Sequence, residues 1–345
     1  MGAIAWSSVL PLIIVSSLII YDEWVSTPSC KVVPGSDSEE YDSGTDDLKV
    51  MMVANLLLLG SESGVVNRYF RDYYMAKFFR KSFHNLNPDM LLVLGDVSAK
   101  GSELTRSKWL PVVDQFHQML GPFLGLPFHA LLGDRDVGEC SGLNAKSVNW
   151  ISGNFPGLDS AGCGAFEIGN ISFVSLNAVA LLCGNNKLRF SVEKTIERES
   201  IDLRMEAKGT AEATDNSGKS NDMYRNFAWR ENAIPSRSGP VLLLHFPLHQ
   251  YESKCSSQIS NTHESRGFSE PGPYDLLHTI PLNATEYIFQ ALKPRIIFSA
   301  HTHEFCDYTH ADGTREVTVS SMTWKARDDP GFVVATFHGN GRGEK

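Results

Sequence analysis

The sequence predicts an α/β protein with mixed β-sheets, and three observations support this fold class. Short apolar runs alternate with longer helix-like stretches from residue 48 onwards. Polar residues, mostly aspartate and histidine, directly follow several of these runs. A hairpin pattern in the middle of the chain adds antiparallel pairing to strands that are otherwise expected to be parallel.

The first part of this alternation repeats one unit of strand, helix and strand. The apolar run LKVMMVANLLLL, residues 48–59, is bounded by Gly60 and is typical of a strand buried on both faces. The expected order continues with a helix at 67–85, a strand at 90–94, a helix at 108–120 and a strand at 128–132. Parallel strands joined by crossover helices collect their carboxyl-end loops at one edge of the sheet. A site is therefore expected at that edge.

The second part of the chain returns to strands after a hairpin and a polar segment. The segments 165–169 and 171–176 predict a hairpin that turns at Gly169 and Asn170. Residues 206–238 are poor in apolar side chains and are expected to form an irregular surface insertion. Further buried strands are expected at 241–244, 295–298, 317–321 and 332–337.

The N-terminal segment predicts attachment to a membrane. Residues 3–21 carry no charge and are long enough to cross a bilayer core of roughly 30 Å. Residues 1–24 are therefore interpreted as a transmembrane signal anchor, with a cleaved signal peptide as the competing reading. Residues 25–47 are acidic and predict a disordered stalk. The folded domain is expected at 48–338, followed by a tail at 339–345.

The charge distribution argues against a nucleic-acid-binding protein. The chain has 345 residues and a formal net charge of -9. Much of this excess lies in the stretch 36–47, which has six acidic residues and no basic one. The rest of the chain is nearly balanced and has no polybasic patch, so no nucleic-acid partner is expected.

Cysteines and glycosylation sequons point to an oxidising compartment. The six cysteines show no C-x-x-C spacing, which argues against a zinc knuckle or a thioredoxin-type motif. Sequons begin at Asn170 and Asn283 and are typical of glycoproteins. The expected location is the membrane of the endoplasmic reticulum or Golgi, crossed once, with the domain in the lumen.

The candidate metal ligands follow different predicted strands. They are Asp96, Asp134 with Asp136, His245, and the pair His301 and His303. Taken singly, a Gly-Asp pair after a strand is usually a turn, and one histidine is usually a hydrogen-bonded core residue. Together, carboxylates and imidazoles at neighbouring strand ends are the donor set that binds a divalent metal ion.

The order of these motifs resembles the calcineurin-like metallophosphoesterases, and in particular their membrane-anchored branch that remodels GPI anchors. The resemblance extends over residues 48–338. It rests on the segments VMMVANLLLLG, MLLVLGDVSAKG, GDRDVG, VLLLHFPLH, SAHTHEFCD and SSMTWKARDDPGF. It implies a four-layered α/β/β/α sandwich with mixed sheets, a site for two metal ions and phosphoesterase activity.

The sequence departs from the family pattern at several positions. The substituted positions are Asn55 for an aspartate, Leu57 for a histidine, Ala99 for an aspartate, Asp134 for an asparagine, Arg135 for the catalytic histidine and Ala300 for a glycine. A leucine cannot bind a metal, and an asparagine offers only a neutral carbonyl oxygen. The first metal position thus keeps Asp96, His303 and at most a weak ligand in Asn55.

The second metal position is the better preserved of the two. It keeps Asp96, Asp134, His245 and His301. One or two divalent ions are therefore expected, with manganese as the implied metal and zinc or iron as alternatives. Arg135 cannot serve as a general acid, but its planar guanidinium can grip a phosphate.

Two functions remain open from the sequence. The first is a hydrolase of phosphoric mono- or diesters with a reduced metal site, acting on ethanolamine phosphate of GPI anchors during transport from the endoplasmic reticulum to the Golgi. The alternative is an inactive pseudophosphoesterase that binds a phosphorylated glycolipid or a partner protein. A disulfide between Cys255 and Cys306 is also predicted, because the two residues follow His245 and His303 on neighbouring loops. Two buried free thiols are the competing interpretation.

Overall fold

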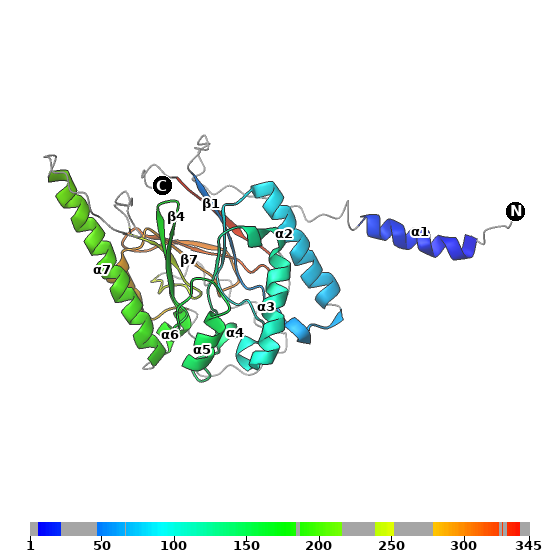
Figure 1. Ribbon diagram of the computed structural model, residues 1–345, viewed down its shortest axis with the longest axis horizontal. Helices are drawn as coiled ribbons and strands as arrows, with labels where there is room; N and C mark the ends of the chain where they lie inside the picture. The colour runs from blue at the N-terminus through cyan, green and yellow to red at the C-terminus, as the bar shows by residue number, and fades with distance from the viewer. Residues whose placement is uncertain are drawn as a thin grey trace, which may run out of the picture.

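The structure is a computed structural model that describes residues 6–21, 47–65, 67–183, 187–215, 239–251, 279–323, 326 and 330–338. Within these ranges two β-sheets form the centre of the protein, and helices cover their outer faces (Figure 1).

The first sheet has the strand order β10-β1-β2-β3. Its strands are β1 (Leu48–Val53), β2 (Met90–Val93), β3 (Phe128–Ala130) and β10 (Val333–Phe337). β1, β2 and β3 are parallel, and β10 pairs antiparallel with β1, with Leu48 opposite Phe337. Parallel pairing of strands separated by helices was the expected arrangement, and the carboxyl ends of all three strands meet at one edge.

The second sheet has the order β4-β5-β6-β7-β9-β8. Its strands are β4 (Gly164–Ile168), β5 (Ile171–Ser175), β6 (Val241–Leu243), β7 (Ile296–Ser299), β8 (Cys306–Thr309) and β9 (Arg315–Thr318). The four central strands are parallel, while β4 and β8 pair antiparallel at the two edges. The predicted hairpin is β4–β5, so the sheet is mixed as expected.

The four layers follow from the alternation of side chains along the strands. Val50 and Met52 of β1 pack into a core between the two sheets, together with Leu243 of β6. Met51 and Val53 point the other way and join the core beneath the helices. Full burial of such a side chain stabilises the fold by roughly 1.5–3 kcal/mol. The predicted α/β/β/α sandwich is confirmed.

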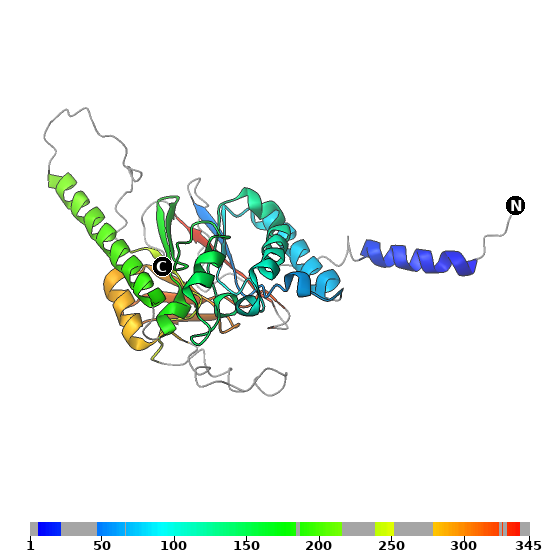
Figure 2. The ribbon, with the colours of Figure 1, turned by 60° about the horizontal axis from the view of Figure 1, so that its bottom comes forward.

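The outer layers are formed by two pairs of helices. α2 (Tyr73–Leu86) and α3 (Arg106–Leu120) cover the first sheet, and Phe79 and Phe116 are their fully buried contacts. α7 (Lys187–Asp215) and α8 (Leu282–Leu292) cover the second sheet and lie side by side (Figure 2). The apolar stripe of each helix explains its position, because that stripe must be buried against a sheet.

Shorter helices connect these layers. They are α4 (Asp134–Val137), α5 (Ala145–Ser152), α6 (Ala178–Leu182), the 3-10 turns η2 (Gly60–Glu62), η4 (Gly101–Glu103) and η5 (Gly121–Gly125), and the π-helical segment η3 (Asn67–Asp72). α4 is the element that carries the candidate ligand Asp134.

The largest differences from the predicted elements are at two places. The apolar run 48–59 is a strand only as far as Val53, because Asn55 and Leu57 adopt positive φ angles of 54° and 51° and turn the chain into a loop. The predicted irregular insertion 206–238 begins as helix, since α7 continues to Asp215. Alanine, glutamate and lysine in that part of the chain favour this continuation. Residues 216–238 lie outside the described ranges.

The predicted membrane segment contains the helix α1 (Trp6–Ile20), with Pro11 inside it. None of the helices in the described ranges is both long enough and apolar enough to cross a membrane. The predicted stalk and tail lie almost wholly outside the described residues.

One disulfide links Cys140 to Cys183, a pairing that the sequence did not predict. It ties the chain shortly after α4 to the end of α6. Cys306 is also disulfide-bonded, but the predicted partner Cys255 lies outside the described residues, so that pairing stays a prediction. Cys163 is a buried free thiol.

Candidate metal centre

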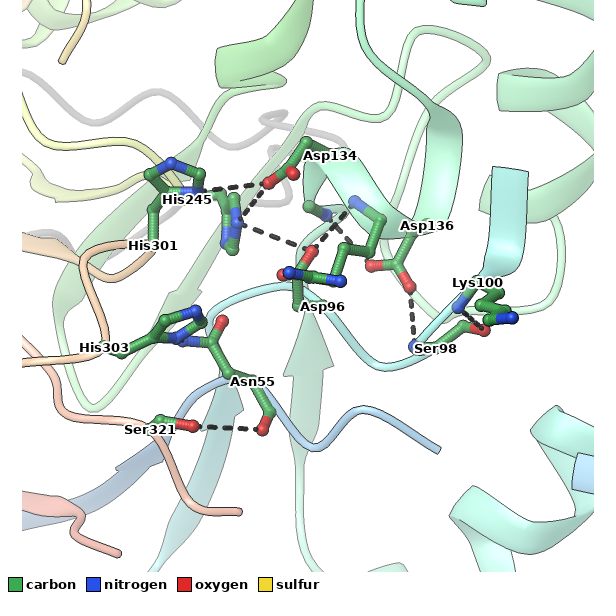
Figure 3. A network of polar contacts seen from close by, with 12 residues as sticks. Asn55, Asp96, Ser98, Lys100, Asp134, Asp136, His245, His301, His303 and Ser321 are labelled. Carbon is green, nitrogen blue, oxygen red and sulfur yellow. Dashed lines mark hydrogen bonds and ion pairs between the residues drawn. The ribbon is translucent and has the colours of Figure 1, made fainter. Parts of the chain in front are cut away.

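The candidate ligands lie on loops that follow strands of both sheets (Figure 3). The first sheet contributes Asn55 after β1, Asp96 after β2 and Asp134 after β3, and the second contributes His245 after β6 and His301 and His303 after β7. The carboxyl ends of parallel strands from two packed sheets thus meet at one place. The sequence predicted Asp96, Asp134 and the three histidines at strand ends, but it placed Asn55 inside the predicted strand 48–59. The structure brings all six into one cluster.

Asp134, His245 and His301 form the tightest group of possible metal ligands. One donor atom from each lies within 4.8 Å of the other two. Oδ1 of Asp134 is 3.0 Å from Nε2 of His245 and 3.2 Å from Nδ1 of His301. One carboxylate and two imidazoles at this separation can surround a single divalent cation.

The backbone fixes the orientation of His245. Its Nδ1 donates a hydrogen bond to the carbonyl oxygen of Leu94 at 2.7 Å, which directs Nε2 towards Asp134 and Asp96. Such an outer hydrogen bond is typical of metal-binding histidines, because it selects the tautomer whose other nitrogen can donate a lone pair. Gly95 has a φ of 89°, and a side chain there would overlap the His245 ring. Glycine is therefore required at this position.

Asp96 lies beside this group and is fully buried. Its Oδ1 is 3.5 Å from Nε2 of His245 and accepts a hydrogen bond from the backbone N–H of Arg135 at 3.1 Å. Its Oδ2 lies 3.5 Å from Nε of the Arg135 guanidinium. A side chain at Gly133 would overlap the Asp96 carboxylate. Asp96 therefore lies between His245 on one side and the guanidinium of Arg135 on the other.

The electrostatics match a site that binds a cation. Burial raises the pKa of Asp96 well above its ordinary value, and the negative charge of Asp134 adds to this effect. Burial also acts to raise the pKa of Asp134, but hydrogen bonds from His245 and His301 hold it well below its ordinary value. For His245, burial lowers the pKa, but Asp96 and Asp134 outweigh burial and raise it to about 9. Asp96 and Asp134 thus favour a positive charge on His245.

Asp136 was grouped with the candidate ligands by sequence, but its carboxylate is used within the protein. It accepts hydrogen bonds from the backbone N–H groups of Gly133, Val97 and Ser98. These bonds join the loop after β3 to the loop after β2. Asp136 therefore positions the two loops that carry Asp134 and Asp96, and it lies outside the close ligand group.

The other half of the site contains Asn55 and His303. Nδ2 of Asn55 is 2.7 Å from Nδ1 of His303, and the buried Oδ1 of Asn55 has no hydrogen-bond partner among the described residues. Burial lowers the pKa of His303 to about 3, assisted by the charges of His301 and Arg135. Leu57, which stands where a histidine ligand is expected, is buried and offers no donor atom.

Unusual backbone conformations gather at this site. Residues other than glycine with positive φ include Asn55, Leu57, Asp96, His301 and His303. Such angles are rare for these residue types and concentrate where surrounding structure imposes them, frequently at functional sites. Leu57 has the same left-handed backbone as the candidate ligands, although its side chain cannot bind a metal.

The donor set fits one divalent metal ion better than two. The group of Asp134, His245 and His301, with Asp96 alongside, supplies both negative charge and imidazole nitrogen. The half around Asn55 and His303 supplies no carboxylate of its own. The choice between manganese, zinc and iron is left open by this mixture of oxygen and nitrogen donors.

Comparison with known proteins identifies related chains. Residues 66–305 match the family model described as calcineurin-like phosphoesterase. The curated protein Metallophosphoesterase 1 of Ailuropoda melanoleuca is 26% identical over 303 residues, covering 86% of this chain and 70% of that protein. The Metallophosphoesterase 1 homolog of Drosophila melanogaster is 25% identical over 299 residues, covering 84% of this chain and 72% of its own length.

Solved structures with related folds were also found. A dimetal phosphatase from Danio rerio superposes with a TM-score of 0.47 at 11% identity, covering 84% of this chain and 93% of that one. A purple acid phosphatase from yellow lupin seeds superposes with a TM-score of 0.46 at 13% identity, covering 84% of this chain and 49% of that one.

Proposed function

The chain belongs to the calcineurin-like phosphoesterase family, and we propose that it hydrolyses phosphoric esters with a single divalent metal ion. The observation that carries this proposal is the convergence of Asp134, His245 and His301 within 4.8 Å, from strand ends of two sheets. Asp96 lies next to them and adds a second carboxylate. These four residues would hold the ion.

When bound, such an ion polarises a phosphoryl oxygen and lowers the pKa of a bound water. The protein contributes the rest from its own side chains. His245 is oriented by Leu94, and Asp96 is fixed by the backbone of Arg135. These hydrogen bonds hold the two side chains in place before substrate binds, which lowers the free-energy cost of ordering the site.

Arg135 replaces the histidine that the family pattern places there. A guanidinium is a cationic hydrogen-bond donor that can hold a phosphate but does not serve as a general acid for the leaving group. The Arg135 side chain is 39% exposed and is therefore accessible from solvent. A leaving group must then take its proton from water. We expect slow turnover for this reason.

We further propose that the substrate is a phosphodiester of the ethanolamine phosphate type carried by GPI anchors. The sequence resemblance to the GPI-remodelling branch supports this choice. A diester has one negative charge, which one metal ion and one guanidinium can neutralise. The Cys140–Cys183 disulfide supports an oxidising compartment, and thus the proposed lumenal side of the endoplasmic reticulum or Golgi membrane.

The test is the metal content and diesterase activity of the same preparation. The full chain, loaded with manganese and dialysed, is expected to retain one ion and to hydrolyse bis(p-nitrophenyl) phosphate slowly. His245→Ala should abolish both, whereas His84→Ala, at an exposed position at the end of α2, should change neither. Failure to retain any ion would refute the proposal. Retention of an ion without turnover of any phosphodiester would instead support the pseudophosphoesterase.

A further inference from the structure

We propose that the half of the site formed by Asn55, His303 and Arg135 is a metal-free subsite for a phosphate-type oxyanion, in which His303 serves as a hydrogen-bond donor. This inference rests on the proposed function, because it assigns a role to the part of the same site that the single metal ion does not use.

The first argument concerns the ring nitrogens of His303. Nδ1 lies 2.7 Å from Nδ2 of Asn55, and an amide nitrogen can only donate. With the Asn55 amide oriented as in the structure, Nδ1 of His303 is the acceptor. A neutral imidazole has one lone pair and one N–H, so Nε2 of His303 carries the hydrogen. A ring nitrogen that carries hydrogen does not bind a metal ion, but it does bind an anionic oxygen.

The second argument is an unpaired polar atom. Asn55 is fully buried, and its Oδ1 has no hydrogen-bond partner among the residues that the structure describes. Figure 3 shows the side chain of Asn55 directed into the site beside His303. An unpaired buried carbonyl costs about 1–3 kcal/mol. A bound group with a hydrogen to give, such as the hydroxyl of a hydrogen phosphate ion, would satisfy it.

The third argument is charge. A divalent cation beside His303 would meet the positive charge of Arg135, whose field reaches the His303 ring, while Asn55 offers it no negative charge. An oxyanion there meets the opposite conditions. Arg135 makes an ion-pair contact to Asp96 through Nε at 3.5 Å, and its guanidinium forms no hydrogen bond to any residue of the described part. Its N–H groups thus remain available for phosphoryl oxygens.

These observations divide the site into one half that favours a cation and one half that favours an anion. The half around Asp134 is anionic and rich in lone pairs, which favours a cation. The half around His303 presents N–H groups and a guanidinium, which favours an anion. A phosphate ester bound across both would place one oxygen at each half.

A spectroscopic test reads the His303 tautomer directly. In NMR of the full chain with nitrogen-labelled histidine, stripped of metal by a chelator, Nδ1 of His303 should have the shift of a ring nitrogen without hydrogen. The signal is assigned by its loss in His303→Gln. In Asn55→Asp, the carboxylate can only accept, so the hydrogen should move to Nδ1. If Nδ1 of His303 carries hydrogen in the unmodified chain, the inference is wrong.

A binding test measures the affinity of the same metal-stripped protein for inorganic phosphate by isothermal titration calorimetry. Arg135→Ala and His303→Ala should each weaken phosphate binding at least about tenfold, since each removes a charge-assisted hydrogen bond. Arg198→Ala, which removes a guanidinium paired with Glu199 on α7, is the matched control and should leave binding unchanged. Equal phosphate affinity in His303→Ala and the unmodified chain would overturn the inference.

The two proposals fail in different ways. Suppose that the metal-stripped chain binds phosphate in a way that depends on Arg135 and His303, but takes up no metal ion. This result would refute the proposed function and support the anion subsite. Uptake of one ion with phosphate binding independent of both residues would refute the subsite alone. Uptake of two ions by the unmodified chain would also refute the subsite, because the second ion would occupy its place.

Discussion

Oδ1 of Asp136 accepts a hydrogen bond from the backbone N–H of Ser98 at 2.7 Å, and this contact joins two loops of the site. Oδ2 of the same carboxylate accepts from the N–H groups of Gly133 at 2.9 Å and Val97 at 3.3 Å. Asp136 is fully buried, so these bonds are shielded from water. This side chain therefore helps to fix the relative position of Asp96 and Asp134, together with the bond from the Arg135 backbone N–H to Asp96.

Asp136→Ala should lower the free energy of unfolding by about 3 kcal/mol or more, because it leaves three buried N–H groups without an acceptor. Asp136→Asn keeps one carbonyl oxygen and should cost less. Urea unfolding of the full chain measures both. Asp114→Ala, at an exposed position on α3, is the control for loss of a carboxylate. A cost for Asp136→Ala no larger than that of the control would contradict this role.

Much of the fold followed from the sequence, since the strands coincide with short apolar runs and the polar residues follow their ends. The prediction was wrong where apolar residues continue beyond a strand. Leu56 and Leu58 are fully buried in the loop after β1, and burial alone cannot distinguish such a loop from a strand. The change of direction depends on the backbone of Asn55 and Leu57, which no apolar pattern encodes.

The sequence predicted which residues lie at the strand ends of the site, but not how their side chains contact one another. The order of Asp134, His245 and His301 along the chain was sufficient to expect them together. The contact between Asn55 and His303 joins residues 248 positions apart, and it depends on side-chain orientation within the folded site. The role of Asp136 is of the same kind, because an aspartate that binds metal and one that binds backbone N–H groups look alike in a sequence.

A pH dependence of stability is expected from His129 on β3. Burial lowers the pKa of His129 to about 4, and Nε2 of His129 lies 2.8 Å from the Ser175 hydroxyl. In the unfolded chain the pKa is about 6.5. Between these two pKa values the unfolded state binds the proton more tightly than the folded state. Neutral His129 therefore makes its full contribution to the free energy of unfolding above pH 6.5, and this contribution is lost as the pH falls to about 4. The loss should reach about 3 kcal/mol.

The measurement is urea unfolding at a series of pH values for the unmodified chain and for His129→Gln. Glutamine can bond to Ser175 but does not titrate, so the difference between the two curves isolates the histidine. The unmodified chain should lose stability relative to the variant as the pH falls. Parallel curves throughout this range would show that His129 is not held neutral by burial.

The Cys140–Cys183 disulfide should stabilise the protein mainly by restricting the unfolded chain. With 43 residues of separation, loop-closure entropy predicts about 4 kcal/mol, and measured values are typically 2–4 kcal/mol. Cys140→Ser, Cys183→Ser and the double variant should therefore lose similar amounts, because each removes the same bond. Thermal and urea unfolding under non-reducing conditions measure the losses.

The buried thiol Cys163 provides the control for this comparison, since Cys163→Ala removes a sulfur without breaking a disulfide. It also removes the acceptor of a hydrogen bond from the Asn177 backbone N–H, so its cost should be that of a small cavity and one weak hydrogen bond. If the double variant lost clearly more than either single variant, the bond would not be the shared cause, and the two positions would contribute through separate contacts.

The last prediction concerns rebuilding the weak half of the metal site with Asn55→Asp and Leu57→His together. The loop after β1 still has the positive φ angles of 54° and 51° at these positions, so the new side chains start from an existing backbone. The aspartate adds a negative charge and accepts a hydrogen from Nδ1 of His303, which frees Nε2 to bind metal. Metal content should rise from one manganese ion per chain to two.

Arg135 limits this gain, because its guanidinium would face the second ion. Adding Arg135→His to the double variant removes that charge and should strengthen binding of the second ion further. Two ions can stabilise both the attacking and the leaving oxygen, whereas one ion cannot, so diesterase activity should rise together with metal content. Metal analysis and hydrolysis of bis(p-nitrophenyl) phosphate follow both quantities. A second ion that binds without any rise in rate would show that the site lacks more than its metal ligands.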